Sequence, residues 1–314
     1  MKRYLPARLR QALTALSVSL LLVASGCTSS SNLAGPEEQP DGTDSVQTDE
    51  PTDEPSEEPS EEPSAEPVEE PTETEPPAPP PVERPAAGDC VRLARSDAFL
   101  EVLVGIPEQS RCSGATGQHV SVKGLTPAMR RAASASDVGT LQTLTAGRCR
   151  RDVLAWLDVD SEGLEISQFQ VMATVPRSDQ VAAGAGFFAC TTYVVKRGSA
   201  LLALSRSTEG VLATSRGRDY GSCARAAITN AGNDTLVCSI THNWRAVAAA
   251  RMGAPEDRYP GDNQLRSRMQ GICENAVRDY LDTTGAYDYG YTWPTRSTWS
   301  NDDRYGLCYA KTRD

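Results

Sequence analysis

The sequence predicts an α+β protein in which two tandem, disulfide-stapled copies of one small unit follow a disordered tether. Each copy is expected to be a small antiparallel sheet with one main helix packed on it. Three observations support this prediction: eight of the nine cysteines divide into two sets of four, their surroundings recur at matching offsets, and each set combines strand-like and helix-like hydrophobic patterns. The predicted organisation is a signal peptide at 1–27, a tether at 28–87, copy 1 at 88–205 and copy 2 at 206–314.

The first 27 residues predict export and attachment to a lipid. Four basic residues precede an uncharged stretch from Ala12 to Ala24, and two further small residues lead directly to Cys27. This arrangement resembles the signal sequence of bacterial lipoproteins. The resemblance implies that the Cys27 thiol is lipidated and anchors the protein to the outer face of the bacterial cytoplasmic membrane. An uncleaved membrane helix is the alternative, but the apolar run is shorter than the roughly 20 residues that a span needs.

Residues 28–87 are predicted to be a disordered acidic tether rich in proline and glutamate. They hold 18 acidic residues and one basic residue, and a Glu-Pro pair recurs at every fourth position from Pro51 to Pro71. Proline removes backbone donors, like charges repel one another, and there is almost nothing apolar to bury. We expect a spacer that holds a folded region away from the lipid surface. The alternative, a ligand for a partner, lacks accompanying aromatic or basic docking residues.

The rest of the chain is nearly neutral. Residues 88–314 hold 26 basic and 24 acidic residues. A nucleic-acid-binding domain needs a concentrated basic field, so this balance predicts that no nucleic acid is bound. The region is also long enough to bury an ordinary hydrophobic core without help from covalent cross-links.

Eight cysteines remain for the folded region once Cys27 carries the lipid. An even number of cysteines in an exported chain predicts disulfides. Zinc is the competing interpretation, but no Cys-x-x-Cys pair is present and the two histidines stand apart, so we expect neither a metal nor another cofactor. Four cysteines allow three pairings, and we expect only that pairs stay within each copy. The eight are Cys90, Cys112, Cys149, Cys190, Cys223, Cys238, Cys273 and Cys308.

The surroundings of the cysteines indicate the duplication. An aromatic-Leu-Asp triplet begins seven residues after Cys149 and again seven residues after Cys273. A proline precedes Cys190 by 14 residues, and another precedes Cys308 by the same number. A histidine follows Cys112 and Cys238 after a short gap in each case. Several independent offsets that agree favour two copies over coincidence.

Local patterns predict the elements within each copy. Strands are expected at 99–104, 169–175, 187–195 and 235–240, where apolar and β-branched residues gather. Helical spacing of apolar residues predicts a helix at 140–157 and a counterpart at 262–281, with Asp262 as its N-terminal cap.

These landmarks resemble the septum formation domain family, in both copies. The resemblance rests on Gly88-Asp89-Cys90, on a cysteine followed closely by a histidine, on Tyr259-Pro260-Gly261 before the helix with Cys273, and on Pro294, Trp299, Arg304 and Cys308. Such proteins are secreted or membrane-tethered in high-GC Gram-positive bacteria. The resemblance implies a partner in division or wall synthesis. The second copy departs from the pattern by opening with Gly221-Ser222-Cys223.

No pattern of an activated nucleophile or a phosphate loop occurs in the sequence, so no catalytic residue is predicted. His119 and His242 are the only histidines and could in principle transfer protons. Because they have equivalent positions and no neighbouring partner in sequence, we expect each to stabilise the turn after a disulfide through a ring nitrogen bonded to backbone.

The strongest candidate for a binding surface lies near the C-terminus. Alternate aromatic residues place four side chains on one face if the segment is extended, a pattern typical of sugar or protein binding and also of a core strand. The candidate residues are Tyr287, Tyr289, Tyr291, Trp293, Arg296, Trp299 and Arg304.

The sequence therefore predicts a lipid-anchored extracellular binding or structural protein, not an enzyme, that serves cell-envelope or division-septum assembly. Its expected partner is a cell-envelope or division protein, or a cell-wall glycan. Two alternatives remain: an envelope enzyme acting on peptidoglycan or a related glycan with His242 as acid or base, and a sensory or adhesive ectodomain.

Overall fold

A computed structural model describes residues 82–228 and 234–312. The predicted signal peptide, Cys27 and nearly all of the predicted tether lie outside the described residues. Below, residues 82–205 are the N-terminal half and residues 206–312 the C-terminal half. Within the part of the chain that the structure describes, no helix combines the length and the apolar character that crossing a bilayer requires.

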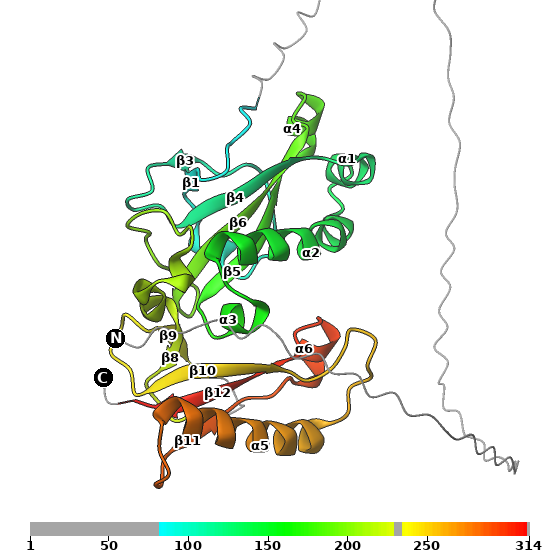
Figure 1. Ribbon diagram of the computed structural model, residues 1–314. Helices are drawn as coiled ribbons and strands as arrows, with labels where there is room; N and C mark the ends of the chain where they lie inside the picture. The colour runs from blue at the N-terminus through cyan, green and yellow to red at the C-terminus, as the bar shows by residue number, and fades with distance from the viewer. Residues whose placement is uncertain (1–81, 229–233, 313–314) are drawn as a thin grey trace, which may run out of the picture. The chain divides into compact units, whose positions relative to one another are not determined.

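The N-terminal half is built around one long central strand, β6, which pairs with β4 on one side and with β5 on the other (Figure 1). β1 continues the sheet beyond β4, and β3 continues it beyond β1. β2 pairs in parallel with β5, whereas the other pairings are antiparallel. The strands are β1 (Cys90–Val91), β2 (Val102–Val104), β3 (Gln109–Ser110), β4 (Gly117–Gly124), β5 (Phe169–Val175), β6 (Phe187–Arg197) and β7 (Ala200–Leu201).

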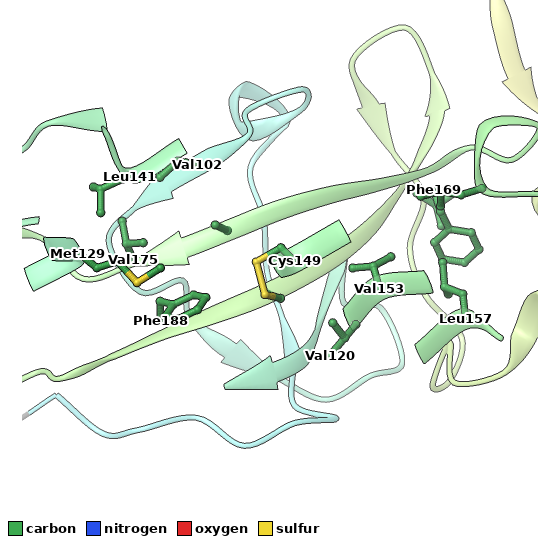
Figure 2. Packing of buried hydrophobic residues seen from close by; sticks show 14 of the residues in the cluster. Val102, Val120, Met129, Leu141, Cys149, Val153, Leu157, Phe169, Val175 and Phe188 are labelled. Atoms are coloured by element: carbon green, nitrogen blue, oxygen red, sulfur yellow. A yellow bond between two sulfur atoms is a disulfide. The ribbon is translucent and has the colours of Figure 1, made fainter. Parts of the chain in front are cut away.

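The principal helix of this half, α2 (Val138–Leu157), begins at Asp137, whose carboxylate accepts a hydrogen bond from the backbone nitrogen of Thr140. Its buried face repeats every four residues and packs on the sheet (Figure 2). That face consists of Leu141, Thr145, Cys149, Val153 and Leu157. The other helices of this half are short, and α1 packs against α2. They are α1 (Pro127–Ser134), α3 (Ser161–Glu165), α4 (Ser178–Ala182) and the 3₁₀ turn η1 (Arg95–Asp97).

The C-terminal half also packs one long helix on an antiparallel sheet, with fewer elements. Its strands follow the order β8, β10, β12, β11, and α5 packs across β12, β10 and β11 (Figure 1). The elements are the 3₁₀ turns η2 (Val211–Ala213) and η3 (Ser215–Tyr220), β8 (Ser222–Ala224), β9 (Thr235–Val237), β10 (Trp244–Arg251), α5 (Asp262–Leu281), β11 (Tyr289–Tyr291), α6 (Arg296–Ser300) and β12 (Tyr305–Lys311). The N-terminal half has the corresponding order β1, β4, β6, β5.

Four disulfides confirm the prediction made from the cysteines. In each half, one of them joins the long helix to the second strand after it: Cys149 to Cys190 on β6 and Cys273 to Cys308 on β12. The other closes a shorter loop, from Cys90 to Cys112 and from Cys223 to Cys238. None of the four crosses from one half to the other.

Backbone hydrogen bonds join the two halves into one sheet. Arg197 of β6 pairs with Leu236 of β9, and an isolated bridge links Ser167 to Gly221. Around that bridge the nitrogen of Ser222 donates to the carbonyl of Ile166 at 2.8 Å. The segment that opens the C-terminal half also packs on the N-terminal core, where Val211 is buried. The two main hydrophobic clusters lie under α2 and under α5, and two smaller ones surround Tyr193 and Leu236.

The structure corrects several details of the predicted elements. Strand β2 begins only at Val102, because Phe99 adopts a positive φ of 68° in a turn. β9 ends at Val237 rather than continuing to residue 240. The N-cap of α5 is Gly261, with a φ of 102°, so Asp262 is the first helical residue and places its charge in the first turn. The sheet is also not wholly antiparallel, since β2 and β5 run in parallel.

Candidate binding surface

Strand β11 forms the end of the sheet order, and the alternate aromatic residues on and beside it share one face. Neighbouring ring centroids lie 5.9 Å apart for Tyr287 and Tyr289, 6.1 Å for Tyr289 and Tyr291, and 5.9 Å for Tyr291 and Trp293. Gly290 points to the opposite face, where Ile228 fills the space beside it. We call the row of Tyr287, Tyr289, Tyr291 and Trp293 the aromatic ladder.

The aromatic ladder is half-buried against helix α5. The hydroxyl of Tyr287 donates a hydrogen bond of 2.7 Å to the backbone carbonyl of Glu274. Tyr289 shares a hydrogen bond with the side chain of Gln270. Partial burial, followed by the nearby charge of Glu274, raises the pKa of Tyr289, so its hydroxyl stays protonated at neutral pH. The polar ends of these two rings are therefore held by the helix. All four rings pack against the cluster under α5 and remain partly exposed.

Polar side chains of α5 border the ladder in a row. Arg278 lies over the ring of Tyr287 and Arg266 over the ring of Trp293, each with its guanidinium carbon 5.9 Å from the ring centroid. Gln270 and Glu274 lie between these arginines at spacings of four residues, which places all four side chains on one stripe of the helix. The surface thus combines flat carbon with cationic, amide and carboxylate groups.

Two residues expected on this surface are buried instead. Trp299 donates its indole hydrogen to the carbonyl of Asp257 at 3.0 Å, and Arg304 lies 4.5 Å from the Trp299 ring. Arg304 donates to the carbonyls of Ala254, Pro255 and Asp257, and so organises the loop before α5. Neither side chain is available to a partner, because both are used to hold that loop.

Arg296 is exposed and lies apart from the ladder's contacts. Its guanidinium is 4.9 Å from the centroid of Tyr259, whose ring meets Trp299 edge-on. The pKa of Tyr259 is raised to about 12 by partial burial and by the hydrogen bond that its hydroxyl donates to Asp262. Arg296 and Arg304 therefore flank the edge-on pair of Tyr259 and Trp299 near the start of α5.

Both histidines are buried in structural settings. The Nδ1 of His242 is 2.8 Å from the carbonyl of Ile240, as expected for a ring that stabilises a turn. His119 differs from the expectation, because its Nδ1 is 2.8 Å from the hydroxyl of Thr191, a side chain on β6. Burial lowers the pKa of His119 to about 4, against a partial opposing effect of Asp89, so the ring is neutral at physiological pH.

A possible metal-ligand group also occurs among the described residues. The sulfurs of Cys223 and Cys238 and a ring nitrogen of His242 lie within 4.8 Å of one another. The two sulfurs are bonded to each other as a disulfide, whereas metal coordination by cysteine requires the thiolate. The group therefore does not fit a metal centre in its oxidised form.

A polar pocket of about 430 Å³ was not predicted from the sequence. In it, Arg150 pairs with Glu165 at 2.8 Å and also lies over the ring of Tyr305. The other charged lining residues are Glu101, Arg251, Asp302 and Asp303. Burial raises the pKa values of Glu165 and Asp303. No local signal could have found this pocket, because its residues come from α2, α3, β10 and the α6–β12 region.

Comparison with known families identifies the class of protein. The family model described as septum formation matches residues 87–289, more than half of the chain. The protein therefore belongs to the septum formation family. The match is one span that runs through both halves, so the prediction of two separate copies of the family domain stays a prediction. No curated protein and no solved structure matches the chain.

Proposed function

We propose that this protein is a non-enzymatic binding protein, anchored by lipid to the outer face of the bacterial cytoplasmic membrane, which serves assembly of the cell envelope at the division septum. The aromatic ladder is the observation that carries the proposal, since it exposes ring carbon at the edge of a scaffold held by disulfides. Membership of the septum formation family supports the setting. Four disulfides suit an oxidising extracellular compartment.

We further propose that the two halves are copies of one ancestral unit. The matching strand orders, the two helix-to-strand disulfides and the left-handed residues that end both long helices support this. A duplication explains how the C-terminal half could gain a binding surface while the N-terminal half kept a closed edge.

Localisation and anchoring test the proposed function. A tagged full-length protein should fractionate with membranes and concentrate at the septum, and Cys27→Ser should release it from the membrane because the acyl chains are lost. In the same cells, Trp293→Ala should reduce the amount of envelope partner recovered by crosslinking. His242→Ala should leave that amount unchanged, provided that the variant folds. Uniform distribution over the cell surface would contradict a septal role. Failure of a folded His242→Ala variant to support the growth that the wild-type protein supports would favour an enzyme.

The polar pocket favours a second candidate function, an ectodomain that senses a small charged ligand. Arg150, Glu165 and Asp303 offer both signs of charge in a space large enough for a small molecule. Glu165→Gln should alter signalling or growth without changing recovery of envelope partners if this function is correct. If recovery falls instead, the pocket serves the folded scaffold.

A further inference from the structure

We propose that the aromatic ladder binds a linear, hydroxyl-rich glycan chain that runs along strand β11. This inference rests on the proposed function, because it names the chemical class of the partner that the same surface takes. It is carried by three observations: the form of the ladder, the composition of its border and the residues that replace it in the N-terminal half.

The ladder presents what a sugar ring stacks on. A pyranose ring has an apolar carbon–hydrogen face and polar hydroxyls at its rim. Tyr287 and Tyr289 turn their hydroxyls toward α5 through bonds to Glu274 and Gln270, which leaves ring carbon toward solvent. The two central rings lie within 24° of parallel, and the row spans about 18 Å. A surface of this length contacts several consecutive sugars rather than one.

The polar border matches the ladder in pitch. Residues four apart on a helix rise about 6 Å, close to the spacing of the rings. The side chains of Arg266, Gln270, Glu274 and Arg278 therefore accompany the rings step by step along β11. Because the rings and the helix side chains both repeat at about 6 Å, the surface fits a polymer of repeating units best.

The composition of the border selects a neutral polymer with both donors and acceptors. Arginine donates, glutamate accepts, and the glutamine amide does both, as hydroxyl and acetamido groups require. Glu274 pairs with Arg278 at 2.9 Å, so these two charges balance within the border. Asp288, beside the ladder, pairs with Lys311 at 2.7 Å. These pairings favour a neutral chain over a strongly acidic peptide such as the chain's own Glu-Pro segment.

The N-terminal half shows that this position does not require aromatic residues. Tyr291 pairs with Cys308 in the register of β11 and β12, and Ala173 pairs with Cys190 in the register of β5 and β6. By the same register, the ladder corresponds to Phe169, Val171, Ala173 and Val175. In that half β2 covers the strand, whereas among the described residues only β12 pairs with β11. The large rings therefore coincide with the edge that is left open.

Titration with soluble glycans tests the inference. Full-length protein in mild detergent should bind an uncharged hexasaccharide of β-1,4-linked N-acetylglucosamine. Binding is followed by the change in tryptophan fluorescence, in which we expect Trp293 to be the residue that responds. Affinity should rise steeply from the disaccharide to the hexasaccharide, because longer chains cover more of the ladder. Tyr291→Ala and Trp293→Ala should each weaken binding roughly tenfold, as expected for aromatic anchors. Binding of Trp293→Ala is measured by calorimetry.

Matched variants separate loss of binding from loss of fold. Tyr280→Ala removes an aromatic residue that is 51 % exposed on the same helix but lies outside the ladder, so binding should be unchanged. Gln270→Ala keeps all four aromatic side chains but removes the hydrogen bond to Tyr289, so it should weaken binding severalfold with only a small decrease in the melting temperature. This variant keeps the test decisive if a ring variant unfolds.

Three results would overturn the inference. The first is absence of binding to the hexasaccharide and to cell-wall glycan stripped of peptide. The second is affinity that does not depend on chain length. The third is binding of a peptide spanning residues 50–71 that the ladder variants abolish, which would assign the surface to a peptide. In each case, septal localisation and Trp293-dependent recovery of a protein partner would leave the proposed function intact, so the two failures are distinguishable.

Discussion

Each half of the protein joins its long helix to a strand by a disulfide at the corresponding place. The two halves differ in which element supplies the large side chain beside that disulfide. In the N-terminal half, Thr145 lies one turn before the helix cysteine and Phe188 two residues before the strand cysteine, and both are buried. In the C-terminal half the same offsets hold Met269 and Gly306. A Cβ atom on Gly306 would lie 2.4 Å from the sulfur of Met269. The large residue of the pair is therefore on the strand in the N-terminal half and on the helix in the C-terminal half.

This exchange indicates that the side-chain volume between helix and sheet is constrained, whereas either element can supply the large side chain. Close-packed interiors tolerate compensating changes better than single changes in volume. The outer edges of the halves differ more. β2 closes the N-terminal edge beside β5, whereas the C-terminal half ends at β11 with its aromatic ladder. Conserved packing and a divergent edge are what we expect of a duplicated unit in which one copy acquired a partner.

The largest expected effect comes from the helix-to-strand disulfides. They close loops of 41 and 35 residues, so removing either by paired Cys→Ala substitution should lower the unfolding free energy by about 4 kcal/mol. Because the cluster under α5 is smaller, loss of Cys273–Cys308 should expose the amides of α5 to hydrogen exchange while α2 stays protected. Equal loss of protection in both helices would show that the halves unfold as one unit.

The buried histidine of the N-terminal half should make stability depend on pH. The folded pKa of His119 is about 4 against 6.5 for the free side chain, so the unfolded chain binds a proton that the folded one excludes. Stability should therefore fall as pH drops from 6.5 to 4, by about 3 kcal/mol in total. Urea unfolding across this range tests it.

His119→Asn is the variant for this measurement, since it keeps a polar group toward Thr191 without a titrating ring. The difference in unfolding free energy between the wild type and this variant should shrink toward low pH, because only the wild type loses stability through His119. A difference that stays constant from pH 6.5 to 4 would exclude the ring as the source. Carboxylates titrate in both proteins and cancel in the comparison.

Local patterns predicted the elements whose apolar residues have a clear period. The predicted strand at 169–175 and the predicted helix at 262–281 match β5 and α5, and the alternation from Tyr287 to Trp293 forms the ladder. Asp158 and Asp282, the last residues of the two recurring aromatic-Leu-Asp triplets, end the long helices in the left-handed conformation. In these segments local preference and tertiary packing favour the same conformation.

The rest depends on contacts that no local pattern encodes. β10 was missed because the strand is rich in alanine, which has a weak preference for strands, and it is held by its pairing with β12. The parallel pairing of β2 with β5 joins residues about 70 apart in sequence. The burial of Arg304 depends on carbonyls near residue 255, which only the folded loop brings within reach.

The exchange of large and small residues predicts a coupled pair. Gly306→Ala should lower the unfolding free energy by about 1–3 kcal/mol, because the new methyl group meets Met269. Met269→Ala alone should cost about 2–5 kcal/mol through a cavity. The double variant should be more stable than the sum of the two effects implies, since the added methyl group occupies part of the cavity.

Urea unfolding of the four proteins gives the coupling energy for this pair. The same Gly→Ala change at a position without a close neighbour provides the control. At Gly271, on the exposed side of α5, an added Cβ atom meets nothing within 4 Å. Gly271→Ala should be stabilising, because alanine favours helix. If the changes in unfolding free energy of the two substitutions at 269 and 306 are additive, the strand shifts away from the helix to make room for the methyl group. Packing would then not explain the exchange of large and small residues between the halves.

The smallest effect tests a feature that the halves share without change. Asp158 and Asp282 end α2 and α5 with φ values of 55° and 47°, a conformation that costs an L-residue energy and that glycine adopts freely. Asp158→Gly and Asp282→Gly should each raise the unfolding free energy by up to about 1 kcal/mol, and equally in the two halves. Asp279→Gly, within α5, should instead lower it by about 1 kcal/mol. A gain confined to one half would show that the other aspartate makes a stabilising interaction, and the two helix ends would then differ in more than sequence.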